Sequence, residues 1–271
     1  MAFYTAMTMV DHILGNAPFV YEGDFLQGIA QAKALGYDAV ELHIADPALV
    51  DVRTLRQALN REDMRLSAIG TGRAYVNEGL SISAEEPQVR QAAVKRLEAF
   101  LDLGAELGAL VILGCMRGNV GPGDTLEQVL GRFQSAMVEL DAYAGRRGTA
   151  LVLEPINRYE NNFLCTLGEV AAFLRENRLS NTGILADTFH MNLEEADLCG
   201  ALRTCAPELR YVHLADSNRL YPGCGHVDFP AILQTLTQCG YTGYLSAECL
   251  PKPSQEAAAA GWIQAVRGLL R

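Results

Sequence analysis

The sequence alternates eight short runs of apolar and β-branched residues with longer segments in which apolar residues recur at helical spacing. Helical spacing is clearest over 23–38, 88–109 and 127–148. Glycines at positions 36, 108, 148 and 240 close such segments, which is typical of helices that end in a left-handed turn. The eight runs, each interpreted as a strand, cover 3–9, 38–44, 65–71, 109–115, 150–156, 183–188, 211–216 and 244–249.

This alternation predicts an α/β fold, a single (β/α)8 TIM barrel domain over residues 1–271. A barrel of this kind takes about 250 residues, and its strands are apolar on both faces because helices cover them. The pattern alone leaves a doubly wound open sheet as the alternative. We predict one domain because no linker rich in proline, glycine or serine divides the chain.

The charge balance and the cysteines indicate partners and location. The chain has 22 Lys and Arg against 32 Asp and Glu, a net charge of −10. An acidic protein repels phosphodiesters and anionic lipid, so we expect no nucleic-acid partner and no membrane partner. No segment approaches the roughly 18 apolar residues of a membrane helix, and no signal-peptide pattern opens the sequence. Seven cysteines without a CxxC pair predict reduced thiols and a cytoplasmic location.

Ionisable side chains interrupt the last four predicted strands. Any one of them alone is more often a salt-bridged or hydrogen-bonded residue than a ligand. In a barrel, however, the carboxyl ends of all strands meet at one mouth, where three carboxylates and an imidazole would repel unless a cation lay between them. Such an oxygen-rich set suits Mn²⁺, Mg²⁺ or Co²⁺, so we predict one divalent ion. The four residues are Glu154, Asp187, His213 and Glu248.

Two arginines follow predicted strands in neighbouring loops. Arg73 comes after Gly70 and Gly72, and Arg117 comes just after the run that ends at 115. At the mouth they could bind a phosphate or carboxylate of the substrate; the alternative is that they pair with site carboxylates or solvent. Glu41 and His43, at the end of another run, could contact substrate or make structural hydrogen bonds.

Several motifs in the second half resemble those of a known family. They are EPINRYE (154–160), DTFHMN (187–192), HLADSNR (213–219), PGCGH (222–226) and Glu248. The chain resembles the xylose-isomerase-like TIM barrels, in particular the sugar phosphate isomerase/epimerase family that includes the D-tagatose and D-psicose 3-epimerases. The resemblance implies a metal, Mn²⁺ foremost, held by the four strand-end residues above. It also implies that Glu154 and Glu248 exchange the substrate proton.

Further residues match the sugar-contacting positions of that family, namely Glu160, His190 and Arg219. We expect Glu160 to hydrogen-bond toward Glu154, and His190 to donate to the substrate carbonyl oxygen. The family surrounds the far end of the sugar with large aromatic side chains, including Trp. This chain has a single Trp, at 262, outside any predicted strand-end loop. That departure, with Arg73 and Arg117, favours an acidic or phosphorylated substrate.

The resemblance thus implies a metal-dependent isomerase or epimerase of a keto sugar or sugar derivative. Proton exchange beside a carbonyl passes through an enediolate, whose oxygen charge a divalent metal stabilises. The alternatives are a metal-dependent lyase or dehydratase on a keto sugar, cyclitol or sugar acid, an endonuclease, which the charge of −10 disfavours, and a carbohydrate-binding barrel. By analogy with such barrels, we expect a homodimer or homotetramer.

Overall fold

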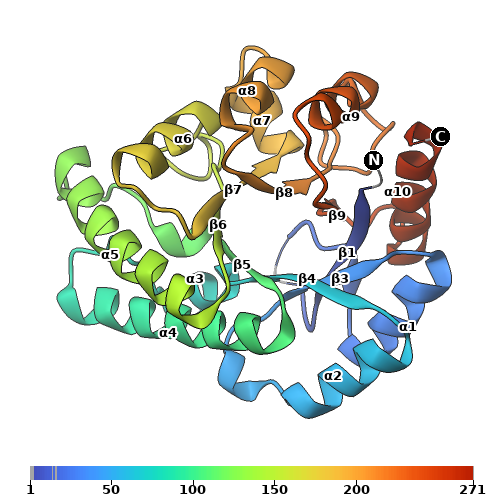
Figure 1. Cartoon of the computed structure of the whole chain (residues 1–271), viewed down its shortest axis with the longest axis horizontal. Coiled ribbons are helices and arrows are strands. Elements are labelled where there is room, and N and C mark those ends of the chain that lie inside the picture. Colours follow the sequence, from blue (N-terminus) through green and yellow to red (C-terminus); the bar gives the residue numbers. More distant parts are fainter. Residues whose placement is uncertain (1–2, 14, 16, 271) are drawn as a thin grey trace.

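Eight parallel strands close into a barrel in the computed structural model, which describes residues 3–13, 15 and 17–270. Each strand pairs with the next, and β1 pairs with β9, so the ring is closed and the open-sheet alternative is excluded. In Figure 1 the strands form the central ring and the helices surround it. The barrel strands are β1 (Tyr4–Val10), β3 (Ala39–His43), β4 (Arg65–Gly70), β5 (Leu110–Leu113), β6 (Leu151–Leu153), β7 (Thr182–Asp187), β8 (Leu209–His213) and β9 (Tyr244–Ala247).

The predicted TIM barrel is therefore confirmed, with one small strand that the sequence did not predict. Strand β2 (Tyr21–Glu22) pairs with the carboxyl end of β1, whereas β9 pairs with the amino end of β1. The hydroxyl of Thr8 joins the two, because it donates to the carbonyl of Ala247 at 2.6 Å and accepts from the amide of Val20 at 3.1 Å. The segment from β2 thus extends the rim of the barrel above β9.

Helices lie between successive strands, as the helical spacing predicted. Two α-helices, rather than one, separate β4 from β5 and β7 from β8, and a short 3-10 helix precedes the α-helix between β3 and β4 and between β5 and β6. Within the part of the chain that the structure describes, no helix is both long and apolar enough to cross a membrane. The helices are α1 (Phe25–Leu35), η1 (Pro47–Leu49), α2 (Val52–Arg61), α3 (Gly72–Glu78), α4 (Pro87–Leu107), η2 (Cys115–Arg117), α5 (Leu126–Arg147), α6 (Leu167–Glu176), α7 (Thr188–Glu194), α8 (Leu198–Cys205), α9 (Phe229–Gln238) and α10 (Gln255–Leu269).

The four glycines predicted to end helices have the expected left-handed backbone. Their φ angles are 94° at Gly36, 71° at Gly108, 69° at Gly148 and 74° at Gly240. Side chains with a Cβ rarely adopt this region, so glycine lets the chain turn sharply from helix into the next strand. These turns lead into β3, β5, β6 and β9 and set where those four strands start.

The apolar core has two parts, one outside the strands and one inside the ring. The outer part joins the strands to the helices, and the buried Trp262 belongs to it, with its indole N–H donating to the carbonyl of Leu214 at 2.8 Å. The inner part fills the barrel, so the lumen is packed rather than open. Its members are Ala68, Ile112, Val152, Leu185 and Tyr211.

Candidate metal centre

Strand periodicity places the four strand-end ionisable residues above the inner core. Side chains two positions apart on a strand share a face, so a residue two positions beyond an inward-facing one also faces the barrel axis. β7 and β8 are in register at Asp187 and His213, which brings these two side chains together. The pairs of lower and upper residues are Val152 with Glu154, Leu185 with Asp187, Tyr211 with His213, and Ser246 with Glu248.

Each of the four side chains offers one atom that could bind a metal ion. These four atoms all lie within 4.8 Å of one another, and all four residues are buried. The Nδ1 atom of His213 lies 3.3 Å from Glu248 Oε2, and 3.8 Å from both Glu154 Oε1 and Asp187 Oδ2. Among the described residues, His213 Nδ1 and Glu154 Oε1 have no hydrogen-bond partner. Buried polar atoms normally have a partner, and a divalent cation bound by three carboxylates and an imidazole would supply one for these two atoms.

Arg219 supplies positive charge beside this cluster. Its guanidinium contacts Asp187 Oδ2 at 2.7 Å and Glu248 Oε2 at 2.5 Å, and it lies over the ring of Phe189 at 4.5 Å. The residue has a φ of 63°, a conformation unusual for an arginine. Burial opposes ionisation of Asp187, but the positive charge of Arg219 outweighs it and holds the pKa of that carboxyl below its usual range.

Burial and the neighbouring charges also shift the pKa values of Glu154 and His213. Burial, followed by the charge of Glu248, raises the pKa of Glu154 well above its ordinary value. Burial opposes the charged form of His213, but the charges of Glu41 and Glu248 outweigh it and raise the pKa of the imidazole. A divalent cation among these atoms would relieve the repulsion between carboxylates that favours the protonated form of Glu154.

A cavity of about 300 Å³ opens directly above the cluster, at the lower end of the size range of small-molecule sites. Phe19, Ile112 and Ile156 form an apolar part of its wall. Asp187 and His213 lie deeper, beneath the cavity floor, and are fully enclosed. The predicted site residues that line the cavity are Arg73, Glu154, Glu160, His190, Arg219 and Glu248.

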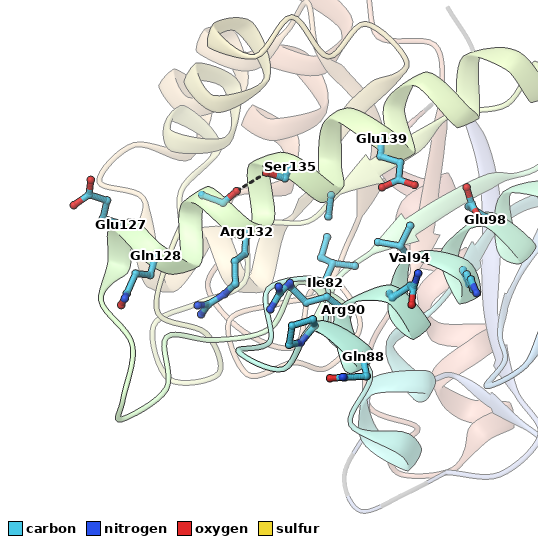
Figure 2. Close-up of a pocket in the computed structure, with 15 residues that line it drawn as sticks. Ile82, Gln88, Arg90, Val94, Glu98, Glu127, Gln128, Arg132, Ser135 and Glu139 are labelled. Atoms are coloured by element: carbon cyan, nitrogen blue, oxygen red, sulfur yellow. Dashed lines mark hydrogen bonds between the residues drawn. The ribbon is translucent and has the colours of Figure 1, made fainter.

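A second, larger hollow lies away from this centre. It has a volume of about 800 Å³ and runs between α4 and α5 on the outside of the barrel. Figure 2 shows Arg90 and Arg132 toward one end and Glu98 and Glu139 toward the other. No strand-end carboxylate lines this hollow, so it is separate from the candidate metal centre.

Comparison with known proteins shows the family. The family model described as xylose isomerase-like TIM barrel matches residues 29–267. The chain belongs to this family. It is 34% identical to a ketose 3-epimerase of Arthrobacter globiformis, over 79% of this chain and 74% of that protein. It is 33% identical to an L-ribulose 3-epimerase of Mesorhizobium japonicum, over 87% of this chain and 80% of the relative.

A solved structure of an L-ribulose 3-epimerase superimposes with a TM-score of 0.86 at 26% identity, and the match covers 99% of this chain and 95% of the other. The whole xylose isomerase-like barrel is therefore shared with that enzyme, including the strands that carry Glu154, Asp187, His213 and Glu248. The likeness extends well beyond the second half of the chain, where the specific sequence motifs lie.

Asn157, in the loop after β6, joins two of the predicted sugar-contacting residues. Its side-chain amide donates to Glu160 Oε1 at 2.8 Å and to His190 Nδ1 at 2.7 Å. Because Nδ1 accepts, the proton of neutral His190 lies on Nε2, which is 3.8 Å from both Glu154 Oε1 and Asp187 Oδ2. Burial lowers the pKa of His190 and favours that neutral form. The expected hydrogen bond from Glu160 to Glu154 is not among the contacts of the described residues. The Glu160 carboxylate instead accepts a hydrogen bond from the Asn157 amide.

The two arginines of the predicted anion site are not brought together. Arg73 lines the cavity, but it is paired with the carboxylate of Asp11 and donates to the carbonyl of His12 at 2.9 Å. Arg117 does not line the cavity and is fully buried behind its wall. Its guanidinium donates to the carbonyls of Glu154, at 2.9 Å, and of Phe163. The placement of Arg117 at the mouth was therefore wrong, since these bonds turn it toward the backbone.

Replacing Arg117 with Met will destabilise the fold rather than weaken substrate binding. The change leaves buried carbonyls without donors, at about 1–3 kcal/mol for each unsatisfied group. We expect the free energy of unfolding, measured with urea, to fall by about 3 kcal/mol or more. Arg73→Met is the matched control, because the Arg73 ion pair is partly exposed and contributes about 1 kcal/mol at most. Equal stability of the two variants would contradict the structural role of Arg117.

Three functional positions were missed or left open by sequence reasoning. Asn157 lies inside the EPINRYE motif, and the run of polar side chains from 157 to 160 after a strand end was the available signal. Gly114 gives room to the Glu154 carboxylate, because a Cβ at Gly114 would lie 2.9 Å from Glu154 Oε2. For Glu41 the sequence left substrate contact and a structural hydrogen bond open; the structure places Glu41 beneath the four strand-end residues, in contact with His213.

Proposed function

We propose that this protein is a metal-dependent ketose 3-epimerase. The observation that carries the proposal is the pair Glu154 and Glu248, which reach one cavity from strands β6 and β9 while sharing a cluster that fits a divalent ion. Inversion at a carbon requires a proton-exchanging group on each face of that carbon, and two carboxylates from separate strands can flank a bound sugar. The ketose and L-ribulose 3-epimerases among its relatives support this activity.

The reaction is divided between the two glutamates and the residues that orient the sugar. Glu154 exchanges the C3 proton on one face of the ketose, and Glu248 exchanges it on the other. His190 presents its Nε2–H toward the cavity and donates to the oxygen on which negative charge develops. Glu154, Asp187, His213 and Glu248 would hold a divalent ion, with Mn²⁺ favoured, and that ion would supply positive charge where the enediolate carries negative charge.

The lining of the cavity favours a free, neutral ketose over an acidic or phosphorylated one. Of the two arginines predicted to bind an anion, Arg117 is turned away and Arg73 is already paired with Asp11. The cavity volume of about 300 Å³ suits a monosaccharide. Phe19 supplies an aromatic wall, in place of the Trp that the sequence lacks near the strand ends. A cytoplasmic location and a homodimeric or homotetrameric assembly stay predictions.

Incubation with Mn²⁺ in deuterium oxide tests the proposal. We expect a neutral ketopentose or ketohexose to gain deuterium at C3 and to equilibrate with its C3 epimer. A ketose phosphate and a keto sugar acid should react more slowly, because no unpaired arginine faces them among the described lining residues. NMR of the recovered sugars measures both position and configuration.

The same spectra decide between epimerisation and the lyase alternative. A lyase or dehydratase forms the same enediolate and then expels a β-leaving group, so it would yield a dehydrated product. Loss of water, or a clear preference for the phosphorylated or acidic sugar, would contradict the proposed function. Binding of a ketose with no exchange at all would indicate a carbohydrate-binding barrel.

A further inference from the structure

Glu41 of β3 is a further carboxylate inside the barrel, and its side chain is completely enclosed. Its two oxygens face donors from four side chains. The donors are His43 Nε2 at 2.7 Å, His213 Nε2 at 3.1 Å, the Tyr211 hydroxyl at 2.9 Å and the Ser246 hydroxyl at 2.6 Å. A buried carboxylate with this many donors is satisfied as an anion, and it has a fixed orientation.

The contact with His213 determines which ring nitrogen faces the metal centre. His213 Nε2 lies 3.2 Å and 3.1 Å from the two Glu41 oxygens, and an ionised carboxylate only accepts hydrogen bonds. Nε2 must therefore carry a proton. The opposite nitrogen, Nδ1, points at Glu154, Asp187 and Glu248 and has no hydrogen-bond partner among the described residues.

The contact with His43 reaches the wall of the cavity. The His43 ring lines the cavity and packs on Phe19, with ring centroids 4.2 Å apart. Gly70 leaves the space that this ring occupies, because a Cβ at Gly70 would lie 2.2 Å from His43 Nδ1. Glu41 is thus a shared acceptor for one imidazole in the metal centre and another in the cavity wall.

We propose that Glu41 is a positioning residue that orients both imidazoles: it holds His213 with Nδ1 as the metal-facing atom, and it holds His43 against the sugar cavity. The inference rests on the proposed function. Partners that bind the far nitrogen of a ligating histidine fix its tautomer and ring orientation, and their loss typically weakens metal affinity by about 10- to 100-fold. Glu41 also comes within 4.8 Å of a donor atom of His43 and of Glu248, but its oxygens already bind donors, so we assign no second ion there.

Calorimetric titration of Glu41→Gln with MnCl₂ tests the first part. We expect the dissociation constant for Mn²⁺ to rise by about 10- to 100-fold, because the neutral Gln amide puts an NH₂ donor in place of one of the two carboxylate oxygens that face His213 Nε2. Tyr211→Phe is the matched control: it removes a hydroxyl donor to Glu41, keeps both imidazole contacts and should leave Mn²⁺ affinity close to that of the wild type. Wild-type affinity in folded Glu41→Gln would overturn the proposal.

A measurement on the unmodified protein covers the case in which Glu41→Gln does not fold. In ¹⁵N NMR spectra of the Mg²⁺-bound protein, His213 should carry its proton on Nε2 and none on Nδ1. The opposite tautomer would overturn the inference. These readouts need no turnover, so they separate the two proposals: wild-type protein that binds neither Mn²⁺ nor Mg²⁺ would contradict the proposed function, whereas normal binding unaffected by Glu41 would contradict only the inference.

Gly70→Ala tests the part that concerns His43. The added methyl group must displace the His43 ring, because the three atoms nearest to it all belong to His43 and none to Glu41 or His213. We expect KM for the ketose to rise severalfold while the Mn²⁺ dissociation constant stays that of the wild type. An unchanged KM would overturn this part of the inference.

Discussion

Removing divalent ions with a chelator will abolish epimerisation, and Mn²⁺ will restore it. Glu154 and Glu248 at the cavity floor meet Asp187 just beneath it, with Arg219 and His213 as neighbours. A ketose proton beside the carbonyl is too weakly acidic to leave without stabilisation of the enediolate charge. The rate of C3 epimerisation after exhaustive dialysis against chelator, and again after addition of MnCl₂, measures the effect. Full activity in metal-free protein would contradict the proposed function.

Binding of Mn²⁺ to the metal-free protein should also change the stability of the fold, and its affinity should depend on pH. An ion present at about 100 times its dissociation constant stabilises the fold by about 2.7 kcal/mol, so the melting temperature should rise. The pKa values of Glu154 and His213 are raised in the metal-free arrangement, and both groups must give up a proton to act as ligands. Affinity for Mn²⁺ should therefore increase with pH until both groups have lost that proton. Affinity that falls as pH rises would contradict this assignment of ligands.

Sequence periodicity predicted the order of strands and helices, because each barrel strand had its own apolar run and four of the turns after a helix had a glycine. Closure of the ring did not follow from the pattern, since an open sheet has the same alternation; the pairing of β1 with β9 decides it. The ends of the strands were less predictable. The run at 150–156 gave a strand of only Leu151–Leu153. The amide of Glu154 still donates to the carbonyl of Leu113 at 3.1 Å, but from Asn157 onward the chain forms hydrogen bonds within its own loop at the mouth. The short β2 has no pattern of its own and forms only because β1 extends past β9.

The site shows where sequence reasoning ends. The convergence of Glu154, Asp187, His213 and Glu248 follows from strand alternation, which the sequence reveals. The direction in which a long side chain extends from a loop cannot be read from that alternation. Arg117 comes four residues after the end of β5, in a predicted mouth loop, yet it extends toward the carbonyls behind the wall. The roles of Asn157 and Glu41 depend on contacts with residues 33 and 172 positions away, which no local pattern encodes.

Glu154→Gln and Glu248→Gln will each lower the rate of epimerisation by at least about three orders of magnitude. Both changes keep the shape of the side chain and remove the group that exchanges a proton on one face of C3. Because both residues are also candidate ligands, the assays should use saturating Mn²⁺, with occupancy measured by calorimetry. Glu160→Gln is the matched control: it changes a cavity-lining carboxylate that bonds to Asn157, so a smaller loss is expected.

Deuterium exchange distinguishes loss of a catalytic base from loss of the metal. With the ion bound, each variant keeps one working glutamate, so it should still exchange the C3 proton of one epimer with solvent while forming little of the other. The two variants should act on opposite epimers, because Glu154 and Glu248 reach the sugar from strands on different sides of the cavity. Exchange into the same epimer by both variants, or near wild-type turnover by either one, would show that the two carboxylates do not divide the faces of C3 between them.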